Sequence, residues 1–246
     1  MQKDPTKPLI ISPCHSRYHP GTMAMLEGLK WHHGWDFKPW FGARGVDRVR
    51  AQAASEALTH ENTYFCWTDD DNFVPAKVVA KLYDDAVALD LDFLAAVVPV
   101  RRARCVANFN PWELNVPIPL GPGGGIRDVR SAGLALALTH RRVFETLAKT
   151  LDEVDYRTAY TEEIIRGWPF FLPMIDPVKR AHWGEDYSFC ERVRAAGMRI
   201  HVDTSVVAWH AAETLLTLAD LHREYEEQQA REIVVDERAA EELEWL

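Results

Sequence analysis

The sequence predicts an α/β protein with a mainly parallel central sheet. Short apolar runs of strand length alternate with stretches in which apolar residues recur at helical spacing. This alternation is typical of strand, helix, strand units, whose connections place neighbouring strands in the same direction. The chain is also long enough for a sizeable core, because 47% of its 246 residues are apolar and 26% are charged.

The first hundred residues contain the clearest alternation. The run at 64–68, YFCWT, is typical of a buried strand, and 91–100 is nearly continuous in hydrophobicity. Pro75 suits the start of the helix that follows the first of these runs, because the first helical residues need no backbone donor. The predicted strands are 8–14, 37–41, 64–68 and 91–100, and the predicted helices are 22–32, 46–58 and 76–89.

The second half of the chain is less regular. Residues 105–130 contain the run GPGGG and predict a hairpin or loop excursion, whereas 152–183 have no clear period and predict a long functional loop or lid. Gly197 stands where a helix C-terminus is expected. The remaining predicted elements are strands at 131–139 and 198–209 and helices at 141–150 and 185–196.

The negative charge of the chain is concentrated at its C-terminus. The 28 Lys and Arg residues stand against 37 Asp and Glu residues, a net charge of −9, and 221–246 alone hold nine acids and three arginines. The balance excludes a general basic surface for nucleic acids but leaves the rest of the chain near neutral. We predict one catalytic domain at 1–214 and an acidic helical tail at 215–246.

The sequence also predicts the compartment. No window approaches the roughly 18–20 apolar residues of a membrane helix, and the N-terminus has no apolar stretch long enough for a signal peptide. The cysteines show no CxxC spacing and have largely apolar or helical neighbours, which favours buried thiols over disulfides or zinc. They are Cys14, Cys66, Cys105 and Cys190. We expect a cytoplasmic protein without membrane insertion.

Three adjacent carboxylates, Asp69, Asp70 and Asp71, follow the strand at 64–68. Ligands of open α/β sheets bind at the carboxyl ends of strands, and a hard divalent cation would relieve the repulsion between the acids. In an extended segment Asp69 and Asp71 would point the same way and Asp70 the opposite way. The alternative is that these acids only stabilise the N-terminus of the next helix.

Further candidates lie in the last third of the chain. Glu185 and Asp186 open a helix, where they serve either as first-turn acids or as a general base in the crevice. Trp183, beside Gly184, is placed to stack on a sugar or base, or simply to pack. His210 ends the last strand, on the edge of the aspartates if that strand is parallel to 64–68, and is either a ligand or an ordinary structural histidine.

Together these segments resemble nucleotide-sugar glycosyltransferases of the GT-A fold, especially family-2-like and small bacterial or phage members. The resemblance covers about Pro8 to His210 and rests on YFCWTDDDNFVPAKVVAKL, SAGLALALTHRRVFETL and GEDYSFCERVRAAGMRIHVDTSVVAWH. It implies a Rossmann-like, three-layer α/β/α domain with a mainly parallel sheet. It also implies a nucleotide-sugar donor and Mn²⁺ or Mg²⁺.

The resemblance assigns the aspartates and the acid pair. Asp69 and Asp71 match the D-x-D motif that binds the metal and the donor diphosphate, with Asp70 near the donor sugar or ribose. Glu185 and Asp186 match the E-D pair, in which the Asp of inverting enzymes is the catalytic base.

The resemblance assigns the remaining site residues as follows. His210 matches the third metal ligand. The segment HWGED looks like the W-G-G-E-D of β-1,4-galactosyltransferases with one glycine fewer, which places Trp183 and Gly184 near the sugar and acceptor. Donor contacts are implied for Arg50, Pro13 and Gly133; Arg50 resembles the arginine of an a-R-N segment, although Gln52 departs from the usual Asn.

These roles imply a single displacement in which Asp186 takes the acceptor proton and configuration inverts. The expected donor is a UDP-sugar in preference to a GDP-sugar, and the acceptor is a glycan or a hydroxylated base in phage DNA. The DNA alternative rests on arginines and on aromatics able to stack on an extruded base. They are Arg101, Arg102, Arg104, Arg127, Arg130, Arg141 and Arg142, with Trp112, Trp168 and Phe170.

Two other functions stay open at this point. One is a metal-binding module without catalysis, in which the aspartates and His210 hold a structural ion. The other is a nucleotidyltransferase, which shares the architecture and the acidic metal site. A nucleotidyltransferase would need a Gly-rich basic loop after the first strand, and PCHSRYHPGT fits that pattern poorly.

Overall fold

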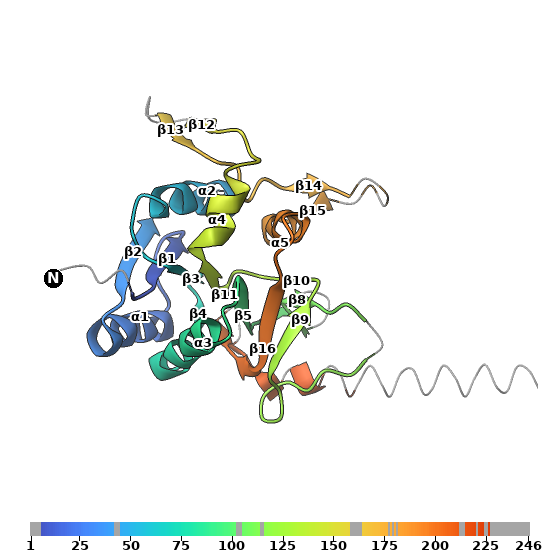
Figure 1. Cartoon of the computed structure of the whole chain (residues 1–246). Coiled ribbons are helices and arrows are strands. Elements are labelled where there is room, and N and C mark those ends of the chain that lie inside the picture. Colours follow the sequence, from blue (N-terminus) through green and yellow to red (C-terminus); the bar gives the residue numbers. More distant parts are fainter. Residues whose placement is uncertain are drawn as a thin grey trace, which may run out of the picture.

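The computed structural model describes residues 6–41, 45–101, 105–113, 116–157, 164–176, 178, 180, 182–211, 215–219, 221–223 and 226. These residues form an α/β fold in which helices cover both faces of a seven-stranded sheet (Figure 1). In spatial order the strands are β2 (Asp36–Phe41), β1 (Leu9–Cys14), β3 (Tyr64–Thr68), β11 (Leu136–His140), β5 (Phe93–Val97), β16 (Ile200–Val207) and β9 (Ile126–Val129).

Most of the central sheet is parallel, as predicted. Strands β2, β1, β3, β5 and β16 run in one direction, and β11 and β9 run in the other. Because β11 is antiparallel to β3, it begins beside the end of β3, with Leu136 opposite Thr68. The segment just before β11 therefore lies at the edge of the sheet where the aspartates emerge.

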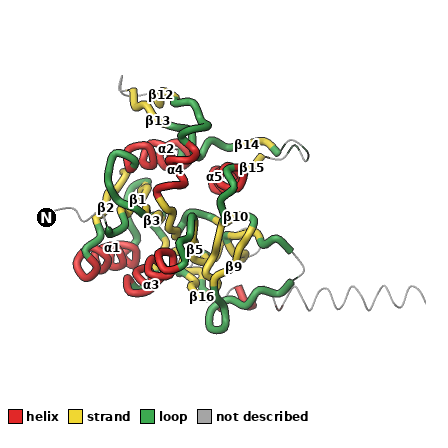
Figure 2. The backbone as a smooth tube through the Cα atoms, viewed as in Figure 1, coloured by secondary structure: helices red, strands yellow, loops and turns green. Residues whose placement is uncertain are grey.

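Helices α1 to α5 form the two outer layers (Figure 2). Helices α1 (Pro20–His33) and α3 (Ala76–Ala88) pack on one face, and α2 (Val46–Ala57), α4 (Arg141–Leu147) and α5 (Glu185–Ala195) pack on the other. Side chains alternate along β3, so Cys66 faces the first layer while Phe65 and Trp67 face the second. The second layer contains a stack of Phe144, Phe171 and Phe189.

The ends of the main helices follow from local sequence. Helix α1 begins with Pro20, and the side chain of His19 accepts a hydrogen bond from the Gly21 amide. It ends at Gly34, whose φ of 71° is the left-handed conformation that favours glycine. Gly197, at a φ of 81°, follows α5 as the sequence predicted.

The prediction of a long loop or lid at 152–183 is wrong for the described part of that segment. It contains two hairpins, β12 (Val154–Arg157) with β13 (Ile164–Gly167) and β14 (Met174–Ile175) with β15 (His182–Trp183). Phe170 and Phe171 lie between them and are fully buried in the core. Phe170 and Phe171 therefore serve packing, and Phe170 is not available to stack on a base.

Short strands form small separate sheets beyond the central one. Strand β4 (Asn72–Phe73) pairs with β17 (Trp209–Ala211), which pairs with β18 (Leu215–Leu216). The excursion after β5 forms two further antiparallel pairs, β6 (Pro99–Arg101) with β7 (Cys105–Ala107), and β8 (Phe109–Asn110) with β10 (Ser131–Ala132).

The start of the predicted tail contacts the rest of the fold. Strand β18 lies at 215–216, and Leu221 is buried against the core. Residues 227–246 contain seven of the nine acids of the segment 221–246. They lie outside the described residues, so the helical tail stays a prediction. Within the described ranges, no helix combines the length and apolar character needed to cross a membrane.

Candidate functional site

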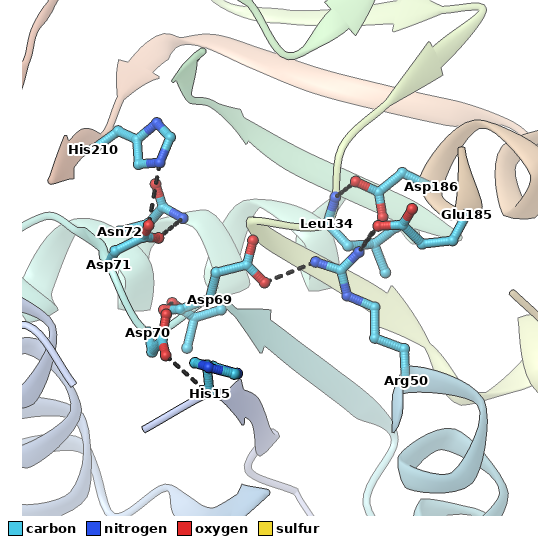
Figure 3. A network of polar contacts seen from close by, with 11 residues as sticks. His15, Arg50, Asp69, Asp70, Asp71, Asn72, Leu134, Glu185, Asp186 and His210 are labelled. Carbon is cyan, nitrogen blue, oxygen red and sulfur yellow. Dashed lines mark hydrogen bonds and ion pairs between the residues drawn. The ribbon is translucent and has the colours of Figure 1, made fainter. Parts of the chain in front are cut away.

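The three aspartates lie where β3 ends, in a turn that leads into β4. The turn separates their side chains, which the expectation for an extended segment did not foresee. Asp69 faces Arg50, the Asp70 carboxylate accepts a hydrogen bond from the His15 amide at 2.9 Å, and Asp71 faces His210 (Figure 3). The acids therefore do not share one partner.

Arg50, on α2, joins three carboxylates from two distant segments. Its Nη2 lies 2.7 Å from Asp69 Oδ1, its Nη1 lies 3.0 Å from Glu185 Oε1, and Nη1 also contacts Asp186 Oδ1 (Figure 3). The Arg50 side chain is only 2% exposed, and its Nε has no partner among the described residues. The guanidinium thus brings the predicted base beside the first aspartate of the D-x-D motif.

The surroundings of Asp186 favour its protonated form more than water does. Burial raises its pKa above the ordinary value, Arg50 lowers it, and the neighbouring carboxylates of Glu185 and Asp69 raise it again. Its Oδ2 accepts a hydrogen bond from the Leu134 amide at 3.2 Å, which fixes the orientation of the carboxylate. A carboxylate so held can accept a proton from a neighbouring hydroxyl.

Asp71 and His210 form the second half of the site. His210 Nδ1 lies 2.7 Å from the Pro99 carbonyl, which only accepts, so Nδ1 carries the proton and Nε2 faces Asp71 Oδ2 at 3.3 Å. The hydrogen bond to Asp71 raises the pKa of His210, and burial opposes that shift. The Pro99 carbonyl thus orients the ring, as a carbonyl hydrogen-bonded to a metal-ligating histidine does in many metal sites.

We tested whether these residues fit a divalent cation. Adjacent ligands of an octahedral ion with bonds of about 2.1 Å lie about 3 Å apart, and the Asp71 and His210 atoms are separated by a similar distance. Carboxylate oxygen with imidazole nitrogen is also a donor set that Mn²⁺ accepts. As they stand, the described residues contain no group of three or more His, Cys, Asp or Glu side chains positioned around one ion. Asp69 lies on the Arg50 side and completes no such group.

A cavity of about 1190 Å³ opens on the Asp186 side of the aspartates. Asp69, Asp186 and His210 line it, together with the proposed sugar contacts Trp183 and Gly184. Gly184 precedes α5 in an extended conformation, and Trp183 is half-buried on β15. The structure therefore brings the segment HWGED and the aspartate turn to one cavity.

A second cavity, of about 660 Å³, lies on the other side of the turn. Asp70 and Asp71 line it, as do Arg17, Tyr18 and His19 from the segment between β1 and α1. The aspartate turn thus contributes to two cavities with different linings, one carrying the carboxylate of Asp186 and the other a cation and aromatic rings.

The two remaining predicted residues have different surroundings. Gly133 lines the larger cavity, and its amide donates to the Asn108 carbonyl at 2.7 Å. Pro13 is buried within β1 opposite Trp40 and lines neither of the two cavities. Its predicted donor contact finds no support in this arrangement.

Sequence reasoning missed Asn108. This residue lies in the irregular excursion between β7 and β8, lines the larger cavity, and is 6% exposed. Its Nδ2 is buried and has no hydrogen-bond partner among the described residues. The run NFN in an irregular segment gave no periodic signal that could have singled it out.

The described arginines among those proposed for nucleic-acid contact lie in different places. Arg130 lines a cavity together with Trp112 and Trp183. Arg141 and Arg142 follow β11 at the opposite edge of the sheet, where they pair with Glu145 and with Asp90 and Asp92. Arg130 lies 3.8 Å from Glu191. Arg102 and Arg104 lie outside the described residues. Trp168 packs against the core, which leaves Trp112 as the exposed aromatic of the three.

The comparisons with known proteins concern the fold. No family model and no curated protein matches the sequence. Among solved structures, the crystal structure of A197 from STIV has a TM-score of 0.51 at 13% identity, over 86% of this chain and 94% of that one. The crystal structure of GalNAc-T7 with UDP, GalNAc and Mn²⁺ has a TM-score of 0.47 at 11% identity, over 83% of this chain and 44% of that one.

Proposed function

We propose that the protein is a metal-dependent glycosyltransferase that moves a sugar from a nucleotide-sugar to a hydroxyl group of an acceptor. The observation that carries this proposal is the Arg50 bridge, which holds Asp186 and Glu185 beside Asp69. A base for an acceptor hydroxyl and acids for a donor site thereby meet at one edge of the sheet, as the sequence resemblance implies.

The two cavities suit the two parts of the reaction. We assign the nucleotide to the cavity lined by Arg17, Tyr18 and His19, and the sugar and acceptor to the cavity lined by Asp186 and Trp183. Asp71 and His210 would hold Mn²⁺ or Mg²⁺, and the bound cation would neutralise charge on the departing diphosphate. The donor is a UDP-sugar in preference to a GDP-sugar.

The chemical step is a single displacement. The acceptor oxygen forms a bond to the anomeric carbon, the bond from that carbon to the diphosphate breaks, and the acceptor proton passes to Asp186. Leu134 and Arg50 hold the Asp186 carboxylate during this transfer. Since the base lies opposite the leaving group in this scheme, the configuration inverts.

A neutral glycan is the acceptor that the charges favour. Asp69, Glu185 and Asp186 line the acceptor cavity, and such a lining repels the phosphates of DNA. The ion-paired Arg141 and Arg142 lie at the far edge of the sheet and cannot offset this repulsion.

Hydrolysis and transfer of radiolabelled UDP- and GDP-sugars test the proposal. We expect sugar release that depends on Mn²⁺ or Mg²⁺ and stops with EDTA, and transfer to neutral glycosides with inversion. Asp186→Asn should lower transfer about 10²- to 10⁴-fold while nucleotide binding persists. Metal binding without any turnover would instead indicate a binding module, and retention of configuration would refute the assigned base.

A further inference from the structure

A third cavity, of about 340 Å³, adjoins the larger one. Four residues line both of them, and Trp183 and Tyr187 are among these four. Asp186 lines the larger cavity only, whereas Trp112 lines the third cavity only. The volume lies within the range of about 300–1,000 Å³ that is typical of sites for small ligands. A ligand that begins beside Asp186 can therefore continue past Trp183 into the third cavity.

Aromatic side chains gather around the third cavity. Trp112, Trp183 and Tyr187 all line it. Trp112 follows β8 and is 54% exposed, and Trp183 is half-buried on β15. A single aromatic residue on a protein surface needs no explanation, but several around one hollow are typical of a ligand site.

The ring of Trp112 is held in place on two sides. Its Nε1 donates to Asp128 Oδ1 at 2.6 Å, which fixes one edge of the indole. The Cζ of Arg194 lies over one ring face, 4.6 Å from the ring centroid, and Arg194 also pairs with Glu191. Because Arg194 occupies that face, a ligand can stack only on the opposite one. The ring is preorganised, so little side-chain entropy is lost when a ligand binds.

Polar side chains accompany the aromatic rings. Asn110, Ser131, Asp176 and Glu191 line the third cavity and supply amide, hydroxyl and carboxylate groups of the kind that bind hydroxyl groups. Among the described residues of the lining, Arg130 is the one cation, and it lies 3.8 Å from Glu191. The lining thus has a surplus of acid, which repels phosphates and favours a neutral ligand.

A sugar ring matches both parts of this lining. A pyranose has an apolar face of C–H groups and a rim of hydroxyl groups. The C–H groups carry partial positive charge and are attracted to the negative face of an aromatic ring, while each hydroxyl both donates and accepts hydrogen bonds. A nucleobase would also stack on Trp112, but its phosphates would meet the surplus of acid.

We propose that the third cavity binds the second sugar unit of the acceptor, stacked on Trp112, while the first unit lies beside Asp186. This inference rests on the proposed function and names the class of acceptor, a neutral glycan of at least two units. Trp112 is then a residue that determines specificity for the length of the acceptor.

The length of the acceptor supplies the first test. In a panel of neutral methyl glycosides, the best disaccharide should be transferred to with a kcat/KM about 10-fold above that of the best monosaccharide. In Trp112→Ala this ratio should fall below about 3, and Trp112→Phe, which keeps a ring, should give an intermediate ratio. A wild-type ratio near one, or an unchanged ratio in Trp112→Ala, would overturn the subsite while the glycosyltransferase proposal stands.

Trp31→Ala is the matched control. Trp31 is 70% exposed on α1, and the Nζ of Lys30 lies 5.3 Å from its ring centroid, so this variant also removes an exposed indole beside a cation. Trp31 lines neither the larger nor the third cavity, and its loss should leave the ratio at the wild-type value. Melting curves of all variants show whether the fold is kept. A fall of the ratio in Trp31→Ala as large as in Trp112→Ala would contradict the assignment.

A binding measurement without donor separates the two proposals. In protein labelled with ¹⁵N-tryptophan, the indole signal of Trp112 is the one missing from Trp112→Phe. Disaccharide glycosides should shift this signal at concentrations about 10-fold below those that monosaccharides need. A shift in a protein that transfers no sugar would keep the sugar-binding cavity and refute the glycosyltransferase. No shift with any disaccharide up to its solubility limit, or a larger shift with a short single-stranded DNA, would rule out the sugar subsite.

Discussion

The guanidinium of Arg50 contacts the carboxylate of Asp186, although 136 positions separate the two residues in the chain. This contact joins α2 to the first turn of α5, and the same guanidinium reaches Asp69 after β3. Arg50 is therefore a structural connection between the aspartate turn and the acid pair. Because it is 2% exposed and lines neither of the two cavities that flank the aspartate turn, its predicted donor contact finds no support in this arrangement.

Replacing Arg50 should cost stability. Arg50→Met would leave the carboxylates of Asp69, Glu185 and Asp186 close together without their shared cation. Because those carboxylates are partly exposed, we expect a loss of about 2–3 kcal/mol, below the full cost of breaking a buried pair. Urea denaturation measures the change. Arg166→Met, which removes exposed pairs, should change stability by under about 0.5 kcal/mol.

Metal affinity should depend on Asp71 and His210. We expect Asp71→Ala and His210→Ala each to weaken Mn²⁺ binding at least 10-fold, measured by calorimetry without any donor. The Asp71 contact raises the pKa of His210, so protons compete with the metal and affinity should fall as pH decreases. Equal Mn²⁺ binding by wild type and both variants would place the ion elsewhere.

His140 should make the protein less stable in mild acid. Its Nδ1 accepts from the Arg142 amide at the start of α4, and burial lowers its pKa below the ordinary value. Arg142 opposes protonation, whereas Asp90, Asp92 and Glu145 favour it. The unfolded chain thus binds this proton more readily, and stability is lost as pH falls from about 6.5 through the lowered pKa.

The control for this pH dependence is His140→Asn, which keeps a capping acceptor without titrating. Melting temperatures between pH 7.5 and pH 5 should fall less steeply for this variant than for wild type. A slope identical to wild type would show that other groups cause the acid sensitivity.

Neighbouring glycines in the GPGGG run should respond differently to a methyl group. A Cβ on Gly124 would lie 2.6 Å from the backbone of Thr204 and Ser205 in β16, whereas a Cβ on Gly125 meets nothing within 4 Å. Since a backbone cannot yield easily, Gly124→Ala should cost about 1–3 kcal/mol. Gly125→Ala should cost less than about 0.5 kcal/mol in the same denaturation experiment. Equal costs would refute the close approach.

The sequence predicted the positions of strands and helices best where the spacing of apolar residues agreed with residues typical of helix and strand ends. The buried strand at 64–68 and the helices beginning at Val46, Ala76 and Glu185 match the structure at their first residues. Strand direction was harder, because antiparallel β11 is buried on both faces over its first four residues, as its parallel neighbours are.

The sequence predicted which residues lie at the site better than it predicted how their side chains are arranged. The aspartates, the acid pair and His210 do lie near one edge of the sheet. The parallel strands β3 and β16 lead to the aspartates and to His210. The acid pair instead follows β15, a strand of a separate antiparallel hairpin. Because the chain turns after Thr68, Asp69 contacts Arg50 and Asp71 contacts His210. The spacing of residues in the sequence does not predict this separation. Asn108 escaped notice because its place in the cavity lining and its unpaired buried Nδ2 are visible only in three dimensions.

The Arg50 bridge also bears on the order of folding during synthesis. Strands β1, β2 and β3 can pair once about seventy residues have left the ribosome, but Glu185 and Asp186 are translated far later. Until then only one of the three carboxylate partners of Arg50, Asp69, has been synthesised. A nascent chain stalled before α5 should therefore be folded in part, and premature termination before Glu185 leaves the proposed active site without its acid pair.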